Sequence, residues 1–436
     1  MYLCGDDAHR LYEIDMNAAA QHEEPGTADS EEVRAFYERL PYPPPLTSLD
    51  SHRSLYSDPD RRRALFHRTW PTERPSEYQE ILIAGCGTSQ AARYALREPN
   101  ARVTAIDISE TSLRHTSELQ QKYSLKNLEL HQLPLESVQK LGRSFDLIVC
   151  TGVLHHLPDP DCGLRALHDV LNRRGALDLM VYARYGRAGI YMLQEYCRML
   201  RIGTTADDLR DLSTLLESLP RNHPIAELLG RVKDFRRPEA IADALLHPRD
   251  RAYTVPELYA WLERCGMSFG RWVEQAPYLP QCGALANIGH RERLDALPAP
   301  AQHAAAELFR GTMTQHHVIA YRSDWPRGPQ GIHFTGEQWR AYVPLRLPWA
   351  LCIRERVPAG SVAVLLNPTH QHHDLVLPIN SAQDHLVGQA DGQRKLGEIV
   401  AACRSSEAAR SALAFFQQLW WYDQIVFDSS AAVAAE

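Results

Sequence analysis

Short apolar runs alternate with amphipathic stretches through residues 80–183. The apolar runs lie at 81–84, 102–106, 128–130, 145–150 and 176–182, and helical spacing fills the gaps at 88–97, 109–123 and 160–171. Short, largely apolar runs are typical of strands buried on both faces of a parallel sheet. The alternation therefore predicts an α/β fold with a doubly wound sheet.

The pattern changes over residues 186–250, where helical spacing dominates. One amphipathic run there consists of Leu209, Leu212, Leu215, Leu216 and Leu219. We expect a helical cap insertion beside the sheet. Beyond it, Thr254 and Glu257 form a capping box for another helix, and a further helix is expected near 300–310. Strand-like runs at 269–273 and 317–321 would complete a seven-stranded sheet.

The two ends of the chain differ from this central region. Residues 1–28 are polar, without clear periodicity, and are expected to be mobile. Residues 29–75 are expected to form a helical and proline-rich lid, because apolar residues at helical spacing precede the proline run at 41–45. Prolines and glycines from 326 to 331 predict a linker. A smaller α+β module is expected over 325–436, with strand-like runs at 361–366 and 375–377, then helices near 381–388, 394–403 and 406–421, ending in residues 424–427.

Composition narrows the classes of partner. The chain has 47 basic and 54 acidic residues, a formal charge of −7, which argues against nucleic acid as the main partner. No stretch approaches the roughly 18 uninterrupted apolar residues of a membrane span, and the first ten residues have no apolar core like that of a secretion signal. The nine cysteines include no Cys-x-x-Cys pair, so we expect reduced thiols, no metal and a cytoplasmic protein.

The clearest chemical signal is a glycine turn after the first strand. Gly85, Cys86 and Gly87 lie between that strand and the next helix. A residue without Cβ lets the backbone approach a ligand closely, and the N–H groups of the helix start face the same place. Such turns also occur for packing reasons, so the turn alone does not identify a ligand.

An acid ends the next strand. Asp107 lies 20 residues after Gly87, the spacing at which a carboxylate meets the ribose hydroxyls of a nucleoside. The alternative is that Asp107 only caps the helix beginning near Ser109. The two elements together favour a nucleoside. The third residue after Gly87 is Gln90 and not glycine, which argues against a pyrophosphate-bearing dinucleotide.

With residues 145–157 and 171–177, the turn and Asp107 resemble the class I S-adenosylmethionine (SAM)-dependent methyltransferases over residues 76–324. The resemblance implies a Rossmann-like sheet and SAM as the cofactor. In this family the glycine turn wraps the methionine part of SAM and the acid binds the ribose. The implied cofactor-binding residues are Ala84, Gly85, Cys86, Gly87, Asp107, Ile108, Gln132, Cys150, Thr151 and His155.

Three positions depart from the family pattern. Ile83, Ser89 and Gln132 stand where the family often has an acid, a glycine and a carboxylate. Backbone carbonyls of Ala84 and Cys150 can replace the first acid, and the amide of Gln132 can hydrogen-bond adenine. These departures keep one alternative open, a non-catalytic SAM-fold protein that acts as a binding or regulatory module.

The acceptor is expected at the carboxyl ends of the fourth and fifth strands, where ligands bind in open α/β sheets. His156 and Tyr185 are the expected catalytic residues, since an imidazole titrates near working pH; the alternative for His156 is packing or orientation of the loop. The expected substrate-contacting residues are Tyr37, Tyr42, Tyr182, Arg184 and Arg187. For Tyr37 and Tyr42, ordinary packing is an equal alternative to closing over the cofactor. A peptide, protein or small molecule is the expected acceptor.

Two signals lie in the last hundred residues. Residues 390–399 resemble winged-helix modules related to PqqD, which bind peptides for modifying enzymes. The rival hypothesis is a structural or dimerising module, so a homodimer is also an expectation. His370, His372, His373 and Asp374 crowd one short segment, but no companion cysteine or Glu-x-x-His pattern accompanies them, which favours a solvated turn over a metal site.

Overall fold

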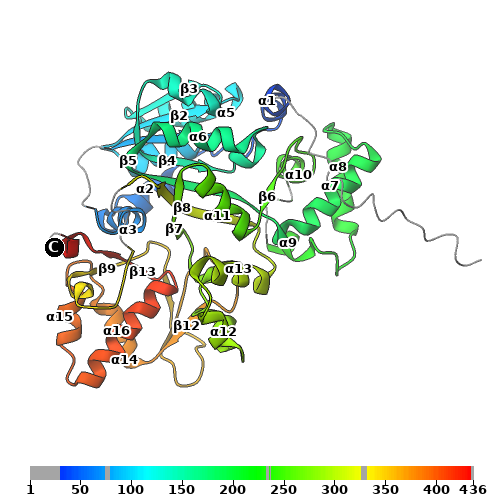
Figure 1. Ribbon diagram of the computed structural model, residues 1–436. Helices are drawn as coiled ribbons and strands as arrows, with labels where there is room; N and C mark the ends of the chain where they lie inside the picture. The colour runs from blue at the N-terminus through cyan, green and yellow to red at the C-terminus, as the bar shows by residue number, and fades with distance from the viewer. Residues whose placement is uncertain (1–29, 74–78, 232–234, 236, 326–330, 434–436) are drawn as a thin grey trace, which may run out of the picture.

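A twisted mixed sheet forms the centre of the protein. The computed structural model describes residues 30–73, 79–231, 235, 237–325 and 331–433 (Figure 1). The main strands follow the order β3-β2-β1-β4-β5-β8-β7, and the short β6 pairs with β5. The strands are β1 (Glu80–Ala84), β2 (Arg102–Asp107), β3 (Leu128–Gln132), β4 (Phe145–Thr151), β5 (Leu171–Ala183), β6 (Ala252–Tyr253), β7 (Met267–Trp272) and β8 (Gln315–Arg322). β8 is antiparallel to both of its neighbours, and the predicted doubly wound, seven-stranded sheet is confirmed.

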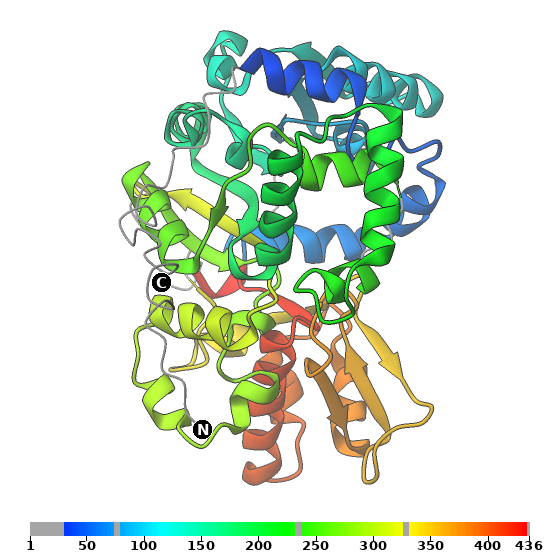
Figure 2. The ribbon, with the colours of Figure 1, turned by 90° about the vertical axis from the view of Figure 1, so that its right-hand side faces the viewer.

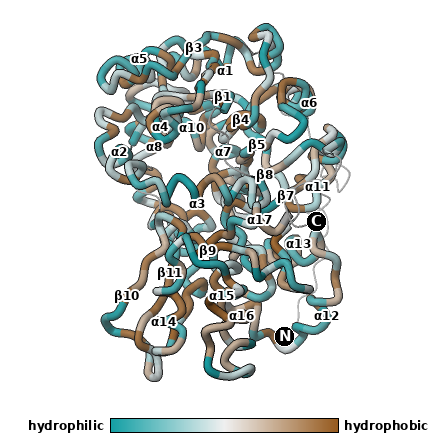
Figure 3. Tube along the Cα trace, turned by 90° about the vertical axis from the view of Figure 1, so that its left-hand side faces the viewer, coloured by the Kyte–Doolittle hydropathy of each residue, from teal (hydrophilic) through white to brown (hydrophobic). Residues whose placement is uncertain are grey.

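Both faces of the sheet are buried, which explains the apolar runs. In β1, Leu82 and Ala84 belong to one core cluster, whereas Ile81 and Ile83 belong to the cluster on the opposite face. The helices that flank the sheet are α4 (Gln90–Arg97), α5 (Glu110–Tyr123), α6 (Pro160–Val170), α11 (Val255–Arg264) and α13 (Ala299–Arg310). Hydrophobic segments accordingly run through the interior of the upper part of the molecule (Figure 3).

The cap predicted over residues 186–250 is helical. It contains α7 (Ala188–Leu200), α8 (Ala206–Ser218), α9 (Ala226–Arg231) and α10 (Pro238–Leu245). Its apolar core also includes Phe36 from α1 (Ser30–Arg39). The other side of α1 meets the sheet domain, because the carboxylate of Glu38 accepts hydrogen bonds from the backbone N–H groups of Glu110 and Thr111 at the start of α5. The first helix thus bridges the cap and the sheet domain (Figure 2).

The elements of the N-terminal region have different neighbours. α1 joins the core of the cap, whereas α2 (Asp50–Tyr56) packs against α4, and α3 (Pro59–Thr69) ends beside the sheet at Trp70, a member of one of its core clusters. α3 packs against the C-terminal domain, where Ala64 joins the apolar cluster of Val343, Leu345 and Val426. Side chains of Arg63 and His67 also contact the carboxylate of Asp428. The lid expected over residues 29–75 stays a prediction, and the contacts of α3 with the C-terminal domain could not be foreseen from sequence proximity.

A smaller α+β domain follows the sheet domain, as predicted, and lies below it in Figure 1. Two small sheets have the orders β10-β11-β12 and β13-β9. The elements are β9 (Val343–Arg346), β10 (Leu351–Ile353), β11 (Ala363–Leu366), β12 (Val376–Ile379), α14 (Ser381–Gln389), α15 (Leu396–Ala401), α16 (Ser406–Trp421), β13 (Ile425–Asp428) and α17 (Ser430–Val433), whereas the short α12 (Arg291–Asp295) belongs to the connection between β7 and β8. Strands β9, β10 and β13 were not predicted. Residues 1–28 and most of the expected linker lie outside the described residues, and the PqqD-like resemblance stays a prediction.

The histidine-rich segment at 370–374 is a turn of which only part is solvated, since His373 is exposed whereas the side chain of His370 is buried. The side chains of His370 and Asp423 are buried, and Nε2 lies 3.0 Å from a carboxylate oxygen. Asp374 accepts hydrogen bonds from the backbone N–H of Ala284 and from Arg310. These partners come from distant parts of the chain, which is why local composition suggested exposure. In the described part of the chain, no helix combines the length and apolar character of a membrane-crossing segment.

Candidate active site

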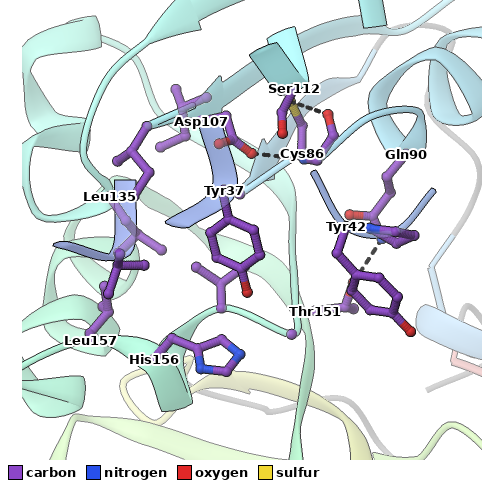
Figure 4. A pocket seen from close by; sticks show the side chains of 18 of the residues that line it. Tyr37, Tyr42, Cys86, Gln90, Asp107, Ser112, Leu135, Thr151, His156 and Leu157 are labelled. Carbon is purple, nitrogen blue, oxygen red and sulfur yellow. Dashed lines mark hydrogen bonds between the residues drawn. The ribbon is translucent and has the colours of Figure 1, made fainter. Parts of the chain in front are cut away.

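A cavity of about 260 Å³ opens at the carboxyl ends of β1, β2, β4 and β5. The glycine turn and Asp107 line one part of it, and residues from α1, the cap and the end of β5 line another (Figure 4). Of the residues expected from the sequence, those in its wall are Tyr37, Tyr42, Gly85, Cys86, Gly87, Asp107, Ile108, Thr151, His156 and Tyr182. Segments that are far apart in sequence thus meet around one cavity.

The glycine turn is shaped so that side chains would obstruct it. Gly85 and Gly87 have φ values of +72° and +55°, in the left-handed region that favours glycine. A Cβ at Gly85 would lie 2.3 Å from Cγ2 of Val153, and one at Gly87 would lie 3.4 Å from Cδ of Pro43. Cys86 lies between them with a backbone N–H that donates to the carbonyl of Ile106 at 3.0 Å. The turn forms a side-chain-free wall, as a close backbone approach to a ligand requires.

Asp107 faces this wall from the end of β2. Its two carboxylate oxygens accept hydrogen bonds from the backbone N–H groups of Gly87, at 2.8 Å, and Ser109, at 2.9 Å. Burial raises the pKa of Asp107. Ser109 itself caps α5 by accepting from the N–H of Ser112, so Asp107 is not the helix cap. Each carboxylate oxygen has a second lone pair, which leaves capacity for the hydroxyl donors of a ribose.

The surface beyond Asp107 suits a flat apolar group. Leu133, Pro134, Leu135 and Leu157 line it, and Glu136 adds a carboxylate. The sequence analysis did not name these residues as part of the site. The apolar run 133–135 directly follows β3, and its place at the carboxyl end of a strand could have indicated a ligand contact. An aromatic base with an exocyclic amino group, such as adenine, fits this combination of apolar surface and acceptor.

Four expected cofactor ligands, Ala84, Gln132, Cys150 and His155, lie outside the cavity wall. The amide nitrogen of Gln132 donates to the carbonyl of Ile108 at 3.2 Å. Ala84 and Cys150 are fully buried within the sheet. Thr151, in contrast, lines the cavity, and its hydroxyl accepts a hydrogen bond of 2.8 Å from the amide of Gln90.

A buried carboxylate dominates the other end of the cavity. Asp243, on α10, is 4% exposed. One of its oxygens accepts from the hydroxyl of Tyr37 at 3.0 Å, and the other accepts from the hydroxyl of Tyr182 at 3.4 Å. Burial raises the pKa of Asp243. Sequence reasoning did not single out this residue, whose only signal is one acid within the apolar stretch 240–246.

His156 lies beside this carboxylate with a defined proton arrangement. Its Nδ1 lies 2.6 Å from the carbonyl oxygen of Arg249, which can only accept. Nδ1 therefore bears the hydrogen, and in the neutral ring Nε2 is an acceptor. The ring also packs on His247, with centroids 3.8 Å apart. In Figure 4 Tyr37 points toward His156 across the cavity.

His155 lies outside the wall and supports it. Its side chain is fully buried, and its ring centroid lies 3.9 Å from that of Tyr182. Burial holds the pKa of His155 well below its usual range, so the ring is neutral. It packs against Tyr182 and does not contact the cavity, in line with the packing alternative for histidines of this loop.

The remaining expected residues also lie outside the wall. Tyr185 is 41% exposed, and Arg184 forms a surface ion pair with Glu257 at 2.7 Å. Arg187 forms a buried ion pair with Asp250 at 2.8 Å, and its guanidinium lies 3.4 Å from the ring centroid of Tyr182. Among these three residues, only Arg187 reaches the site, and it does so through Tyr182.

The strand order, the glycine turn and the acid at the end of β2 define a class I methyltransferase domain, whose methyl donor is SAM. Comparison with known families agrees, because a family model described as a methyltransferase domain matches residues 82–177. A ubiquinone biosynthesis O-methyltransferase from Pseudomonas fluorescens is 26% identical over 153 residues, which cover 30% of this chain and 64% of that enzyme.

The similarity to one relative extends much further along the chain. The uncharacterized protein syc1184_c from Synechococcus sp. is 31% identical over 317 residues, 69% of this chain and 75% of the relative. The chain belongs to the same family as this Synechococcus protein. Among solved structures, PKMT2 from Rickettsia typhi in complex with AdoHcy has the same fold, with a TM-score of 0.61 and 14% identity over 86% of this chain and 76% of that one.

Proposed function

We propose that the protein transfers the methyl group of SAM to a peptide, protein or small molecule that enters the cavity beside His156. The observation that supports this most directly is the continuity of the cavity, which joins the glycine turn and Asp107 to His156 and Asp243. A cofactor end and a proton-accepting end within one cavity are what methyl transfer between two bound molecules requires.

The residues present fit the cofactor. Asp107 would hold the ribose hydroxyls, the turn at 85–87 would face the methionine part, and Leu133 to Leu135 would cover the adenine. When bound, SAM supplies a methyl group activated by its sulfonium. The chain's own contribution is orientation and the exclusion of water, which α1 and the cap provide by closing the side of the cavity opposite the sheet.

His156 is the proposed general base. The hydrogen on Nδ1 is held by the carbonyl of Arg249, so Nε2 is the ring atom that can accept a proton from an acceptor group. Asp243 lies close enough to influence this ring electrostatically.

Isotopically labelled SAM tests the proposal. Incubating the protein with SAM labelled in the methyl group and an extract of its own cells should label a specific acceptor. His156→Gln should reduce the initial rate about 100-fold or more, the typical contribution of a general base. His290→Gln, at an exposed histidine outside the cavity, is the matched control and should retain the rate. Equal rates in both variants would contradict the role of His156, and the absence of label with the wild-type protein would contradict the proposed function.

A further inference from the structure

Three groups at the acceptor end of the cavity, the hydroxyls of Tyr37 and Tyr182 and the ring of His156, share one property: each offers a ligand an acceptor and no donor. A tyrosine hydroxyl has one proton, and the protons of Tyr37 and Tyr182 both point to Asp243. The two phenolic oxygens therefore have only lone pairs left for a ligand. Nε2 of His156 is also an acceptor, because Nδ1 of the same ring donates to the carbonyl of Arg249.

The charges around the acceptor end also favour a ligand that donates hydrogen bonds. Asp243 is a buried carboxylate in the cavity wall. The nearby guanidinium of Arg187 does not offset it for a ligand, because Arg187 is paired with Asp250 and lies against the ring of Tyr182, outside the wall. Arg93 does line the cavity, but it comes from α4, one turn beyond Gln90 on the glycine-turn side. A second carboxylate brought close to Asp243 would meet repulsion in a poorly solvated space.

From this geometry we infer that the methyl acceptor is a hydroxyl or an amine, a group with an O–H or N–H to donate, and that Asp243 excludes carboxylates from this position. The inference rests on the proposed function and narrows its acceptor class. Asp243 acts as a specificity-determining residue, since it orients both tyrosine hydroxyls and sets the sign of the potential. Its bonds to Tyr37 and Tyr182 also join α1, α10 and β5 around the acceptor.

The reaction balances with groups that are present. The acceptor oxygen or nitrogen forms one bond to the methyl carbon and loses one proton, which Nε2 of His156 takes. The bond broken is that between the methyl carbon and the sulfonium sulfur, whose electron pair remains on a neutral thioether. No oxidant, reductant or further reactant is needed.

The chemical stability of the labelled product tests the inference even while the acceptor molecule is unidentified. A methyl ester releases labelled methanol in mild alkali, whereas a methyl ether or methylamine retains its label. We expect the label to survive alkali, and release of volatile label would overturn the inference. Fragmentation of the labelled product in a mass spectrometer then separates the two sources, because it locates the methyl group on an oxygen or on a nitrogen.

Calorimetry with S-adenosylhomocysteine, the demethylated product of SAM, separates this inference from the proposed function. Absence of binding by the wild-type protein would contradict the proposed function, whereas binding together with alkali-labile label would contradict only the acceptor class.

The variant Asp243→Asn tests the residue itself. The asparagine amide offers a donor where the carboxylate offers an acceptor, so the tyrosine hydroxyls lose their common orientation. We expect the acceptor KM to rise at least tenfold, with the acceptor-containing extract fraction as the varied substrate. The affinity for S-adenosylhomocysteine should stay within threefold of wild type. Asp207→Asn, at an exposed acid in the same cap, should change neither quantity. An unchanged acceptor KM in Asp243→Asn would overturn the assignment.

Discussion

The two ends of the cavity are built in different ways. The cofactor end is assembled from consecutive βα units between residues 81 and 157, in which each functional residue follows a strand. The acceptor end depends on a hydrogen bond between Tyr37 and Asp243, which are 206 positions apart in sequence. The cofactor end is thus determined by local backbone geometry, whereas the acceptor end is determined by the packing of α1 and the cap against the sheet.

Gly85→Ala is expected to have the largest effect on the cofactor end. The new Cβ would collide with Val153 and force a left-handed residue to bear a side chain. We expect the affinity for S-adenosylhomocysteine to fall at least 100-fold in calorimetric titration. Gly142→Ala is the matched control, because Gly142 also has a positive φ, +64°, but has nothing within 4 Å of the added Cβ. Similar affinities in the two variants would show that the turn does not face the cofactor.

This difference between the two ends explains what the sequence could predict. The glycine turn, Asp107 and the alternation of strands and helices follow from short-range patterns, and the structure contains all three. Asp243 belongs to no sequence motif. Its place in the site can be recognised only in the folded structure, where α10 brings it to the hydroxyl of Tyr182 on β5. For the same reason the sequence did not predict that α1 packs against the cap whereas α3 packs against the C-terminal domain. Only tertiary contacts distinguish these two helices.

Among the residues expected at the site, burial and partners decided which ones reach the cavity. Arg184 and Arg187 are three positions apart, yet one pairs with Glu257 at the surface and the other with the buried Asp250. The side-chain amide of Gln132 donates its hydrogen bond to the carbonyl of Ile108 and not to the cavity. Spacing along the chain does not contain this information.

Asp107→Asn should have the next largest effect. The amide retains one acceptor oxygen but loses the charge that strengthens hydrogen bonds to hydroxyl donors. The expected loss in affinity for S-adenosylhomocysteine is about 1.5 to 3 kcal/mol, roughly 10- to 150-fold. Glu110→Gln, at an exposed acid three residues along the chain, should leave the affinity unchanged. Unchanged affinity in a folded Asp107→Asn protein would exclude the ribose role.

Acidification should distinguish the two ends through protein stability. Burial holds the pKa values of His155 and His247 well below 6.5 in the folded protein. The unfolded chain therefore binds protons first, and the free energy of unfolding should fall as pH drops below about 6.5. Each histidine is expected to contribute about 1 to 2 kcal/mol of this loss between pH 7 and pH 5. At the cofactor end, the raised pKa of Asp107 acts in the opposite direction, because its unfavourable contribution disappears as pH falls through the folded pKa.

Denaturant unfolding of His155→Phe at several pH values measures this contribution. Phenylalanine retains a ring against Tyr182 and cannot be protonated, so the slope of stability against pH should be smaller than in the wild-type protein. His290→Gln, at an exposed histidine, should leave the slope nearly unchanged. A slope equal to that of the wild type in His155→Phe would mean that His155 is not held neutral.

Gln132→Ala is expected to have the smallest effect. Because this side chain lies outside the cavity wall and bonds the backbone of Ile108, the affinity for S-adenosylhomocysteine should change less than threefold in calorimetric titration. Glu136→Gln, in the wall itself, should weaken binding more than Gln132→Ala does. The reverse order would indicate that Gln132 contacts the adenine, as expected from the sequence.

A crystal structure of the protein with S-adenosylhomocysteine tests the central claim most directly. We expect the ribose hydroxyls at the carboxylate of Asp107, the adenine over Leu135, and the sulfur on the side of the cavity that faces His156 and Asp243. Electron density for the nucleoside outside this cavity, or a carboxylate of Asp107 turned away from the sugar, would contradict it.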